Sequence, residues 1–316
     1  MRVSEVQHRL LQLCAIRLDD QSPDWSVLAR EAMHVGSMDE LAEGRLVERS
    51  APARKTAALL RRGLADEARW RDRVDEELEL AATADARLVT VMDDDYPTNL
   101  RLIYNLPPFL FVRGTEPAPG DARSVAVVGT RQPSPQGLKR ASQLAERLVD
   151  AGVVVISGLA RGIDASAHRA TLDRGGRTVA VVGTGITRTY PKENEELAEE
   201  IAKGGMIVSQ FWPSTSPAKW TFPRRNVVMS GMSQGSAVVE ASSTSGARMQ
   251  ARLALEHGKM VFLLKSLVTS QPWAQKFVAE RGAREVSSVD EIVDALAPAE
   301  RIHEVKSARQ LTLELV

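Results

Sequence analysis

A regular alternation that begins at residue 124 restricts the possible folds of this chain most strongly. Short, continuously apolar runs such as SVAVVG (124–129), VVVISG (153–158) and RTVAVVG (177–183) are each followed by a segment with helical spacing of apolar residues. Strands that are apolar throughout must be covered on both faces, which is typical of parallel sheets. The sequence therefore predicts an α/β fold, a Rossmann-like, mostly parallel sheet covered by helices on both faces.

Four regions follow from the change of pattern along the chain. Residues 1–85 combine helical spacing with many charges and predict a small helical N-terminal domain. Residues 86–121 hold short apolar runs broken by Pro and Gly, which indicates an extension and linker into the core. We expect the Rossmann-like domain over 122–297 and a C-terminal tail over 298–316.

Composition narrows the class of protein. The single cysteine, Cys14, excludes an intrachain disulfide and a cysteine-based metal cage. Charges interrupt the N-terminal segment, and no apolar run has the length of a membrane span. We therefore expect a cytoplasmic protein without a membrane partner.

Net charge is zero, but its distribution is uneven. Residues 122–260 hold 18 Lys/Arg and 11 Asp/Glu, a net charge of +7. Such asymmetry favours a polyanionic partner. Chance and ordinary solvation of helix surfaces are the alternative explanation.

Three of the expected strands end in glycine turns. These are GTRQPSPQG (129–137), GLARGID (158–164) and GTGITRTYP (183–191). Ligands of such sheets bind beyond the carboxyl ends of the strands, where free backbone N–H groups suit a phosphate. The turns lack the G-x-G-x-x-G fingerprint, the ribose-binding acid, the Walker A lysine and the G-x-S-x-G nucleophile turn. We expect no cofactor, no metal and no catalytic residue.

Arginines and aromatic residues accompany the turns. The arginines are Arg131, Arg161, Arg188, Arg224 and Arg225. The segment 210–223 adds the aromatic residues Phe211, Trp212, Trp220 and Phe222. Cations interleaved with exposed aromatic rings are typical of surfaces that bind single-stranded nucleic acid. Phe211 and Phe222 fit equally well as core residues at the sheet edge.

Several of these stretches, in this order, resemble the DNA-processing protein A (DprA/Smf) family. They include VAVVGTRQPSPQG, VVVISGLARGIDASAHRATL and FPRRNVVMSGMSQGSAVVEA, and the resemblance spans about residues 88–295. It implies a non-enzymatic, single-stranded DNA-binding protein that protects DNA and loads a RecA-type recombinase. It also implies a homodimer that acts in DNA uptake, transformation or recombination.

The resemblance carries over to individual positions. Gly129, Thr130 and Arg131 match the first turn of the family, with Thr in place of Ser. Gly158, Arg161, Gly162 and Asp164 match the second turn, and His168 matches a helix histidine. Phe222, Pro223, Arg224, Arg225 and Asn226 match the FPxRN segment. With Gly183, Thr184 and Arg188 of the third turn and Trp220, these positions except Asp164 and Pro223 form the predicted nucleic-acid interface.

The chain also departs from the family. The stretch KSLVTSQPWAQKF (265–277) stands where the family has a glycine-rich loop, and we expect no C-terminal winged helix after the Rossmann-like domain. A divergent paralogue is therefore a second interpretation.

Three features with acidic or basic side chains invite a chemical role. His168 has no evident nucleophile or metal beside it, so we expect a structural hydrogen bond to the turn. Asp93 to Asp95 lack the spaced ligands of a calcium loop and predict a solvated turn. Glu240 could cap the next helix, pair with Arg131 or act as an acid. If it acts as an acid, the alternative function is a nucleotide sensor or nucleotide hydrolase, for example in a defence system.

Overall fold

In the computed structural model, which describes residues 3–34, 37–298, 300–302 and 304, one nine-stranded sheet runs through the molecule in the order β1-β2-β6-β5-β4-β3-β7-β8-β9. Its parallel strands are β3 (Ser124–Val128), β4 (Val154–Ser157), β5 (Thr178–Val181), β6 (Met206–Ser209), β7 (Gly235–Val238), β8 (Met260–Leu264) and β9 (Arg284–Val286). The predicted parallel sheet is confirmed.

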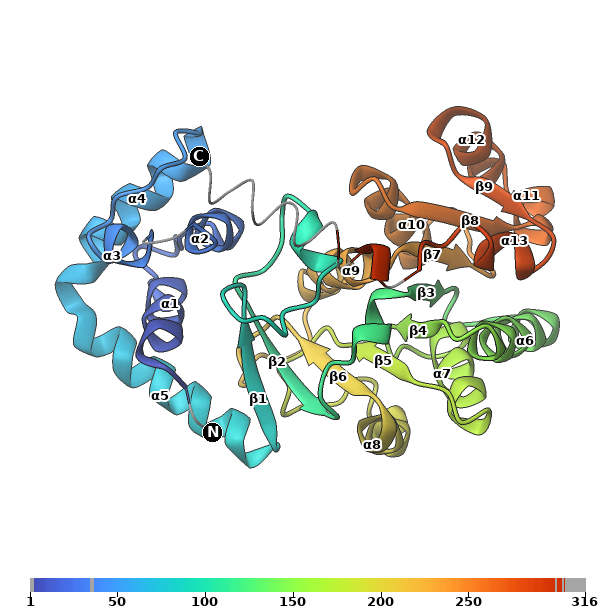
Figure 1. Ribbon diagram of the computed structural model, residues 1–316, viewed down its shortest axis with the longest axis horizontal. Helices are drawn as coiled ribbons and strands as arrows, with labels where there is room; N and C mark the ends of the chain where they lie inside the picture. Colours follow the sequence, from blue (N-terminus) through green and yellow to red (C-terminus); the bar gives the residue numbers. More distant parts are fainter. Residues whose placement is uncertain (1–2, 35–36, 299, 303, 305–316) are drawn as a thin grey trace.

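Helices cover both faces of this sheet (Figure 1). They are α6 (Pro135–Asp150), α7 (Ile163–Asp173), α8 (Glu195–Gly204), α9 (Thr221–Met232), α10 (Gly246–Glu256), α11 (Lys265–Ser270), α12 (Pro272–Arg281) and α13 (Asp290–Val293). Strand β3 shows the alternation: Val125 and Val127 pack in a cluster with α6, α7 and α13. Ala126 and Val128 belong to the larger cluster, which includes residues of α9 and α10.

An antiparallel pair extends one edge of the sheet. Strands β1 (Ala86–Thr90) and β2 (Phe109–Gly114) pair with each other, and β2 pairs antiparallel with β6. The predicted solvated turn at Asp93 to Asp95 is wrong in one respect, because Asp93 is engaged: its carboxylate accepts hydrogen bonds from the backbone N–H and hydroxyl of Thr90 and from the side chain of Gln7.

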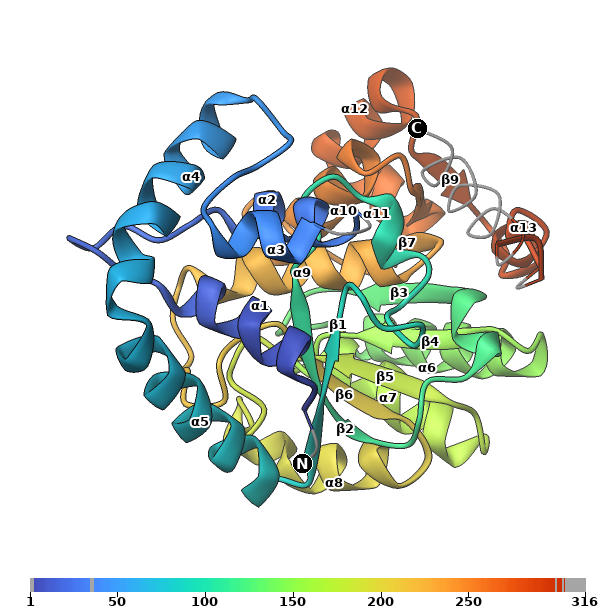
Figure 2. The ribbon, with the colours of Figure 1, turned by 60° about the vertical axis from the view of Figure 1, so that its left-hand side comes forward.

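The N-terminal helices gather on the β1 side of the sheet (Figures 1 and 2). They are α1 (Glu5–Ala15), α2 (Trp25–Ala32), α3 (Ser37–Ala42), α4 (Ala51–Gly63) and α5 (Glu67–Thr83). Side-chain caps begin three of them, from Ser4, Asp24 and Ser50. Trp25 of α2 packs against Phe109 of β2 and against Trp212, so helices and sheet share one hydrophobic cluster.

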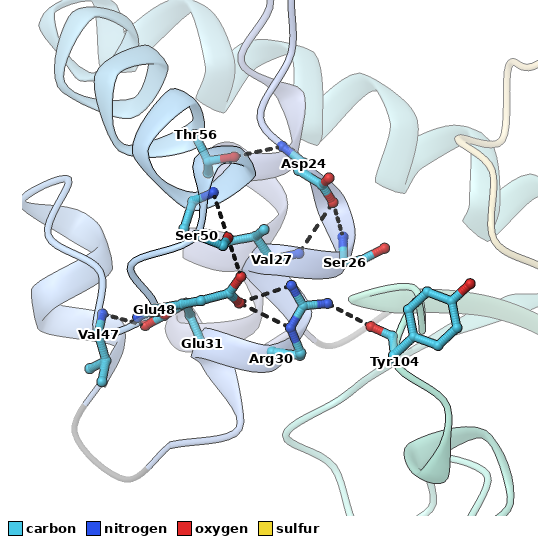
Figure 3. A network of polar contacts seen from close by, with 11 residues as sticks. Asp24, Ser26, Val27, Arg30, Glu31, Val47, Glu48, Ser50, Thr56 and Tyr104 are labelled. Carbon is cyan, nitrogen blue, oxygen red and sulfur yellow. Dashed lines mark hydrogen bonds and ion pairs between the residues drawn. The ribbon is translucent and has the colours of Figure 1, made fainter. Parts of the chain in front are cut away.

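A polar network ties the loop after α3 to α2 (Figure 3). The carboxylate of Glu31, which is buried, accepts hydrogen bonds from the backbone N–H groups of Val47 and Glu48. Arg30 pairs with Glu48 and also donates to the backbone carbonyl of Tyr104. The helices are thereby linked to the segment that leads into β2. No helix in the described part of the chain is long and apolar enough to cross a membrane.

The strand order places a switch point beside β3. The chain steps from β3 through β4 and β5 to β6 in one direction and returns to β7 on the other side of β3. Helices α6 and α10, which follow β3 and β7, cover opposite faces of the sheet. The loops after these two strands therefore diverge and leave a crevice, the usual ligand position in such sheets.

Candidate nucleic-acid interface

The three glycine turns lie side by side. They follow β3, β4 and β5, which are neighbours in the sheet. In the second turn, the backbone that leads into α7 has positive φ angles at two residues: Leu159 has φ 57° and Gly162 has φ 76°. Gly162 suits this conformation because glycine carries no side chain to strain it. We call this surface the glycine-turn edge and define it by residues 129–134, 158–162 and 183–191.

A buried ion pair between Asp164 and Arg225 lies beneath the surface of the three turns and connects them. The Asp164 carboxylate accepts hydrogen bonds from the backbone N–H groups of Gly129, Gly158 and Ala160. Its oxygen lies 3.9 Å from the Arg225 guanidinium, which donates to the carbonyl of Val181 in β5. Asp164 and Arg225 are thus in contact with backbone from all three strand ends.

Burial governs the protonation of this pair. It raises the pKa of Asp164, against the opposing effects of Arg225 and the backbone donors. It lowers the pKa of Arg225, and the neighbouring Arg131 acts in the same direction. A cation this deep requires its carboxylate partner, so the two side chains position the turns together.

Gly158 makes room for the guanidinium. A Cβ atom built at this position would lie 1.2 Å from Nη1 of Arg225. Any other residue would displace either the turn or the arginine. The glycine is therefore required by the close approach of Arg225.

Arg224 and Arg225, which the sequence places together at the interface, lie in different environments. Arg225 is only 6% exposed, whereas Arg224 is exposed. Both residues lie in the first turns of α9 rather than in a loop, together with Phe222 and Asn226. The sequence predicts Arg225 at the nucleic-acid interface; in the structure most of its side chain is buried against Asp164 and the carbonyl of Val181, and the rest lines both hollows of the edge.

Two further predicted residues are buried. His168 is fully buried and its Nδ1 lies 2.7 Å from the Thr178 hydroxyl, which donates to the carbonyl of Val155. His168 Nδ1 is therefore the donor, and the partner lies on β5 rather than on the turn. Thr184 is 1% exposed and its hydroxyl donates to the carbonyl of Arg188. These side chains shape the edge and do not reach its surface.

The buried imidazole makes stability depend on pH. Burial, assisted by the charge of Arg225, lowers the pKa of His168 from 6.5 to about 3. Below pH 6.5 the unfolded chain binds a proton that the folded chain excludes, so the free energy of unfolding should fall as the pH is lowered. The slope from this group approaches 1.4 kcal/mol per pH unit, about one proton. Urea unfolding between about pH 6 and 5 should show a shallower slope for His168→Gln; equal slopes would contradict a neutral, buried His168.

The surface of the edge carries arginines and a few rings. Arg131, Arg161 and Arg188 are exposed, one from each turn. The Arg131 guanidinium lies 5.3 Å from the ring centre of Phe222, and the ring of Tyr190 lies 5.7 Å from that ring. Arg161 pairs with Glu193 at 2.6 Å. A polyanion would therefore meet Arg131 and Arg188, which have no carboxylate partner among the described residues, and Arg161, which is already paired with Glu193.

The aromatic prediction is only partly right. Phe211 and Trp212 are 2% and 8% exposed and belong to the interior, so neither can stack on a base. Trp220 is 55% exposed, and the Arg224 guanidinium lies 5.6 Å from its ring centre. Phe222 is half-buried between two hollows of the edge.

The larger hollow occupies the switch point. It has a volume of about 410 Å³, and Thr130, Arg131, Asn226, Ser245 and Gln250 are among its lining residues. The smaller, of about 40 Å³, lies between Arg161, Tyr190 and Phe222. The sequence analysis did not identify Ser245 and Gln250 as site residues. The serine-rich run before α10 was the one feature of the sequence that could have pointed to them.

Glu240 is engaged by the first turn. Its carboxylate accepts hydrogen bonds from the backbone N–H and hydroxyl of Ser134, the residue that caps α6. It neither caps the next helix nor pairs with Arg131. Among the described residues, no group of His, Cys, Asp and Glu side chains could hold a metal ion.

Comparison with known proteins identifies the relatives of this chain. The sequence pattern of the family described as DNA recombination-mediator protein A matches residues 87–297. The chain belongs to this family. The family match covers both the glycine-turn edge and α9.

Individual members agree with the family assignment. The DNA processing protein DprA of Bacillus subtilis is 35% identical over 209 residues, 66% of this chain and 70% of the relative. That of Streptococcus pneumoniae is 36% identical over 205 residues, 65% and 72% of the two chains.

Solved structures agree with the fold. The structure of the Streptococcus pneumoniae protein matches with a TM-score of 0.72 and 27% identity, over 94% of this chain and 100% of that one. DNA processing protein A of Helicobacter pylori shares the fold, with a TM-score of 0.59 and 24% identity over 66% of this chain and 94% of that one.

Proposed function

We propose that the glycine-turn edge binds single-stranded DNA and that the protein works by binding rather than by catalysis. The observation that carries this proposal is the row of three adjacent turns, each with one exposed arginine, next to the exposed Trp220 and Arg224. Successive phosphates would contact backbone N–H groups and arginines, and Trp220 would stack on a base.

Family membership supports the same ligand and a partner. The family is described as a recombination mediator, and the solved Helicobacter pylori relative is described by its single-stranded DNA binding mode. We propose that this chain, as a homodimer in the cytoplasm, protects single-stranded DNA and delivers it to a RecA-type recombinase.

One observation favours a second candidate. The 410 Å³ hollow falls in the usual size range of small-ligand pockets, and Oε1 of the buried Gln250 has no hydrogen-bond partner among the described residues. A nucleotide sensor would use this hollow alone.

Thermal unfolding with ligands separates the two candidates. We expect oligo-dT to raise the melting temperature and single mononucleotides to leave it unchanged, because several phosphates must be held at once. A shift with a mononucleotide and none with oligo-dT would reverse the ranking.

A further inference from the structure

A second cleft opens between the N-terminal helices and the sheet. Its volume is about 930 Å³, more than twice that of the hollow at the switch point. Trp25, Lys55 and Arg73 line it from the helical side. Phe211, Trp220 and Arg224 line it from the side of the sheet and α9. Its walls thus come from segments far apart in the sequence.

The start of α9 forms the wall between this cleft and the glycine-turn edge. Trp220, Arg224 and Val227 line the cleft, spaced by four and three residues as one face of a helix requires. Phe222, Arg225 and Asn226 line the hollow of the glycine-turn edge instead. A chain that leaves the edge beside Phe222 therefore enters the cleft by passing over Trp220 and Arg224.

The charges of the cleft favour an anionic occupant. Lys55, Arg73 and Arg224 are exposed, and no carboxylate lies within ion-pair distance of them in the part of the chain that the structure describes. The acids that line the cleft are already engaged. Asp20 pairs with Arg17 at 2.9 Å, and the Asp24 carboxylate caps α2.

Unpartnered amide groups supply a second, independent indication. Gln210 is 8% exposed and lines the cleft, and its Nε2 has no hydrogen-bond partner among the described residues. Oδ1 of Asn105, also in the lining, is buried and unpartnered in the same sense. Amide donors and acceptors beside rings such as Trp220 are the groups that read the edges of unstacked bases.

The helical wall of the cleft is braced. The backbone N–H of Asp24 donates to the hydroxyl of Thr56 at 3.0 Å, which joins the start of α2 to α4 (Figure 3). On the far side, the carboxylate of Glu77 in α5 accepts a hydrogen bond from the backbone N–H of Ser214 at 2.9 Å. Lys55 and Arg73 are therefore held on helices that are fixed relative to the sheet.

We propose that this cleft binds a second stretch of the single-stranded DNA that occupies the glycine-turn edge. The inference rests on the proposed function and assigns the N-terminal helices a direct part in DNA binding. Phosphates of the second stretch contact Lys55, Arg73 and Arg224, and its bases lie toward Trp220 and Gln210.

Binding of short and long DNA to matched variants tests the inference. The probes are oligo-dT of about 6 and about 25 nucleotides, short and long relative to a single binding groove. The variant is Lys55→Ala/Arg73→Ala, and the control Arg49→Ala/Arg62→Ala removes two exposed cations of the same region that do not line the cleft. All four side chains are exposed, so both variants should fold as the parent does.

We expect Lys55→Ala/Arg73→Ala to bind the short probe normally and the long probe about tenfold more weakly. For the long probe, the slope of the logarithm of the association constant against the logarithm of salt concentration should be shallower by about 1.4, because two phosphate contacts are lost. The control should match the parent with both probes.

The inference would be overturned if Lys55→Ala/Arg73→Ala bound the long probe as the parent does, if it weakened binding of both probes equally, or if the control variant weakened binding as much. In each of these cases the proposed function of the glycine-turn edge would still stand. If the parent protein binds neither probe, the proposed function fails and the inference fails with it.

Discussion

Replacing Asp164 by alanine is expected to lower the free energy of unfolding by about 3–5 kcal/mol, the cost of removing one partner from a buried ion pair. The change leaves the Arg225 guanidinium buried without its carboxylate and leaves three backbone N–H groups without an acceptor. Urea denaturation at neutral pH measures the effect. DNA binding should be lost as well, because the three turns are no longer held together.

Two controls separate the ion pair from simple loss of volume. Asp164→Asn keeps an acceptor of the same size and should fall between Asp164→Ala and the parent. Asp164→Ala/Arg225→Met removes both charges and should recover part of the loss. A midpoint for Asp164→Ala within experimental error of the parent would mean that the pair does not hold the turns.

Replacing Arg131 and Arg224 together by alanine is expected to weaken oligo-dT binding by about 10- to 100-fold near physiological salt, for about two lost phosphate contacts. Both side chains are exposed and stack on the rings of Phe222 and Trp220, so the fold should be retained. Fluorescence anisotropy with labelled oligo-dT gives the dissociation constants.

The matched control is Arg169→Ala/Lys203→Ala, which removes two exposed cations outside both the glycine-turn edge and the cleft. Its affinity should stay within about twofold of the parent, since non-contacting charges act only through the screened field. Equal weakening by the two double variants would point to net charge rather than to a defined interface.

Periodicity in the sequence was sufficient to predict the sheet. Strands such as Val154–Ser157 are buried along their whole length and apolar up to the final serine, and the helices between them repeat apolar residues at helical spacing. The adjacency of the three turns follows from this pattern and from the parallel order of the strands. For the same reason Arg131, Arg161 and Arg188 could be placed at one edge without a structure.

Helix α9 could not be predicted in the same way. It carries Pro223 in its first turn, where proline is tolerated, and it is buried on most sides, so its residues show no amphipathic period. Its burial arises from contacts with strands distant in sequence. Those contacts, and not a local pattern, leave Arg224 exposed and bury Arg225. The burial of Phe211 and Trp212 depends on them in the same way.

Binding of oligo-dT by the unmodified protein as a function of salt tests the central claim most directly. The logarithm of the association constant should fall linearly with the logarithm of salt concentration, with a slope of about −0.7 for each phosphate held. Exposed Arg131, Arg188 and Arg224 lead us to expect a slope of about −2 or steeper. Absence of binding at low salt, or an affinity independent of salt, would contradict single-stranded DNA binding at the glycine-turn edge.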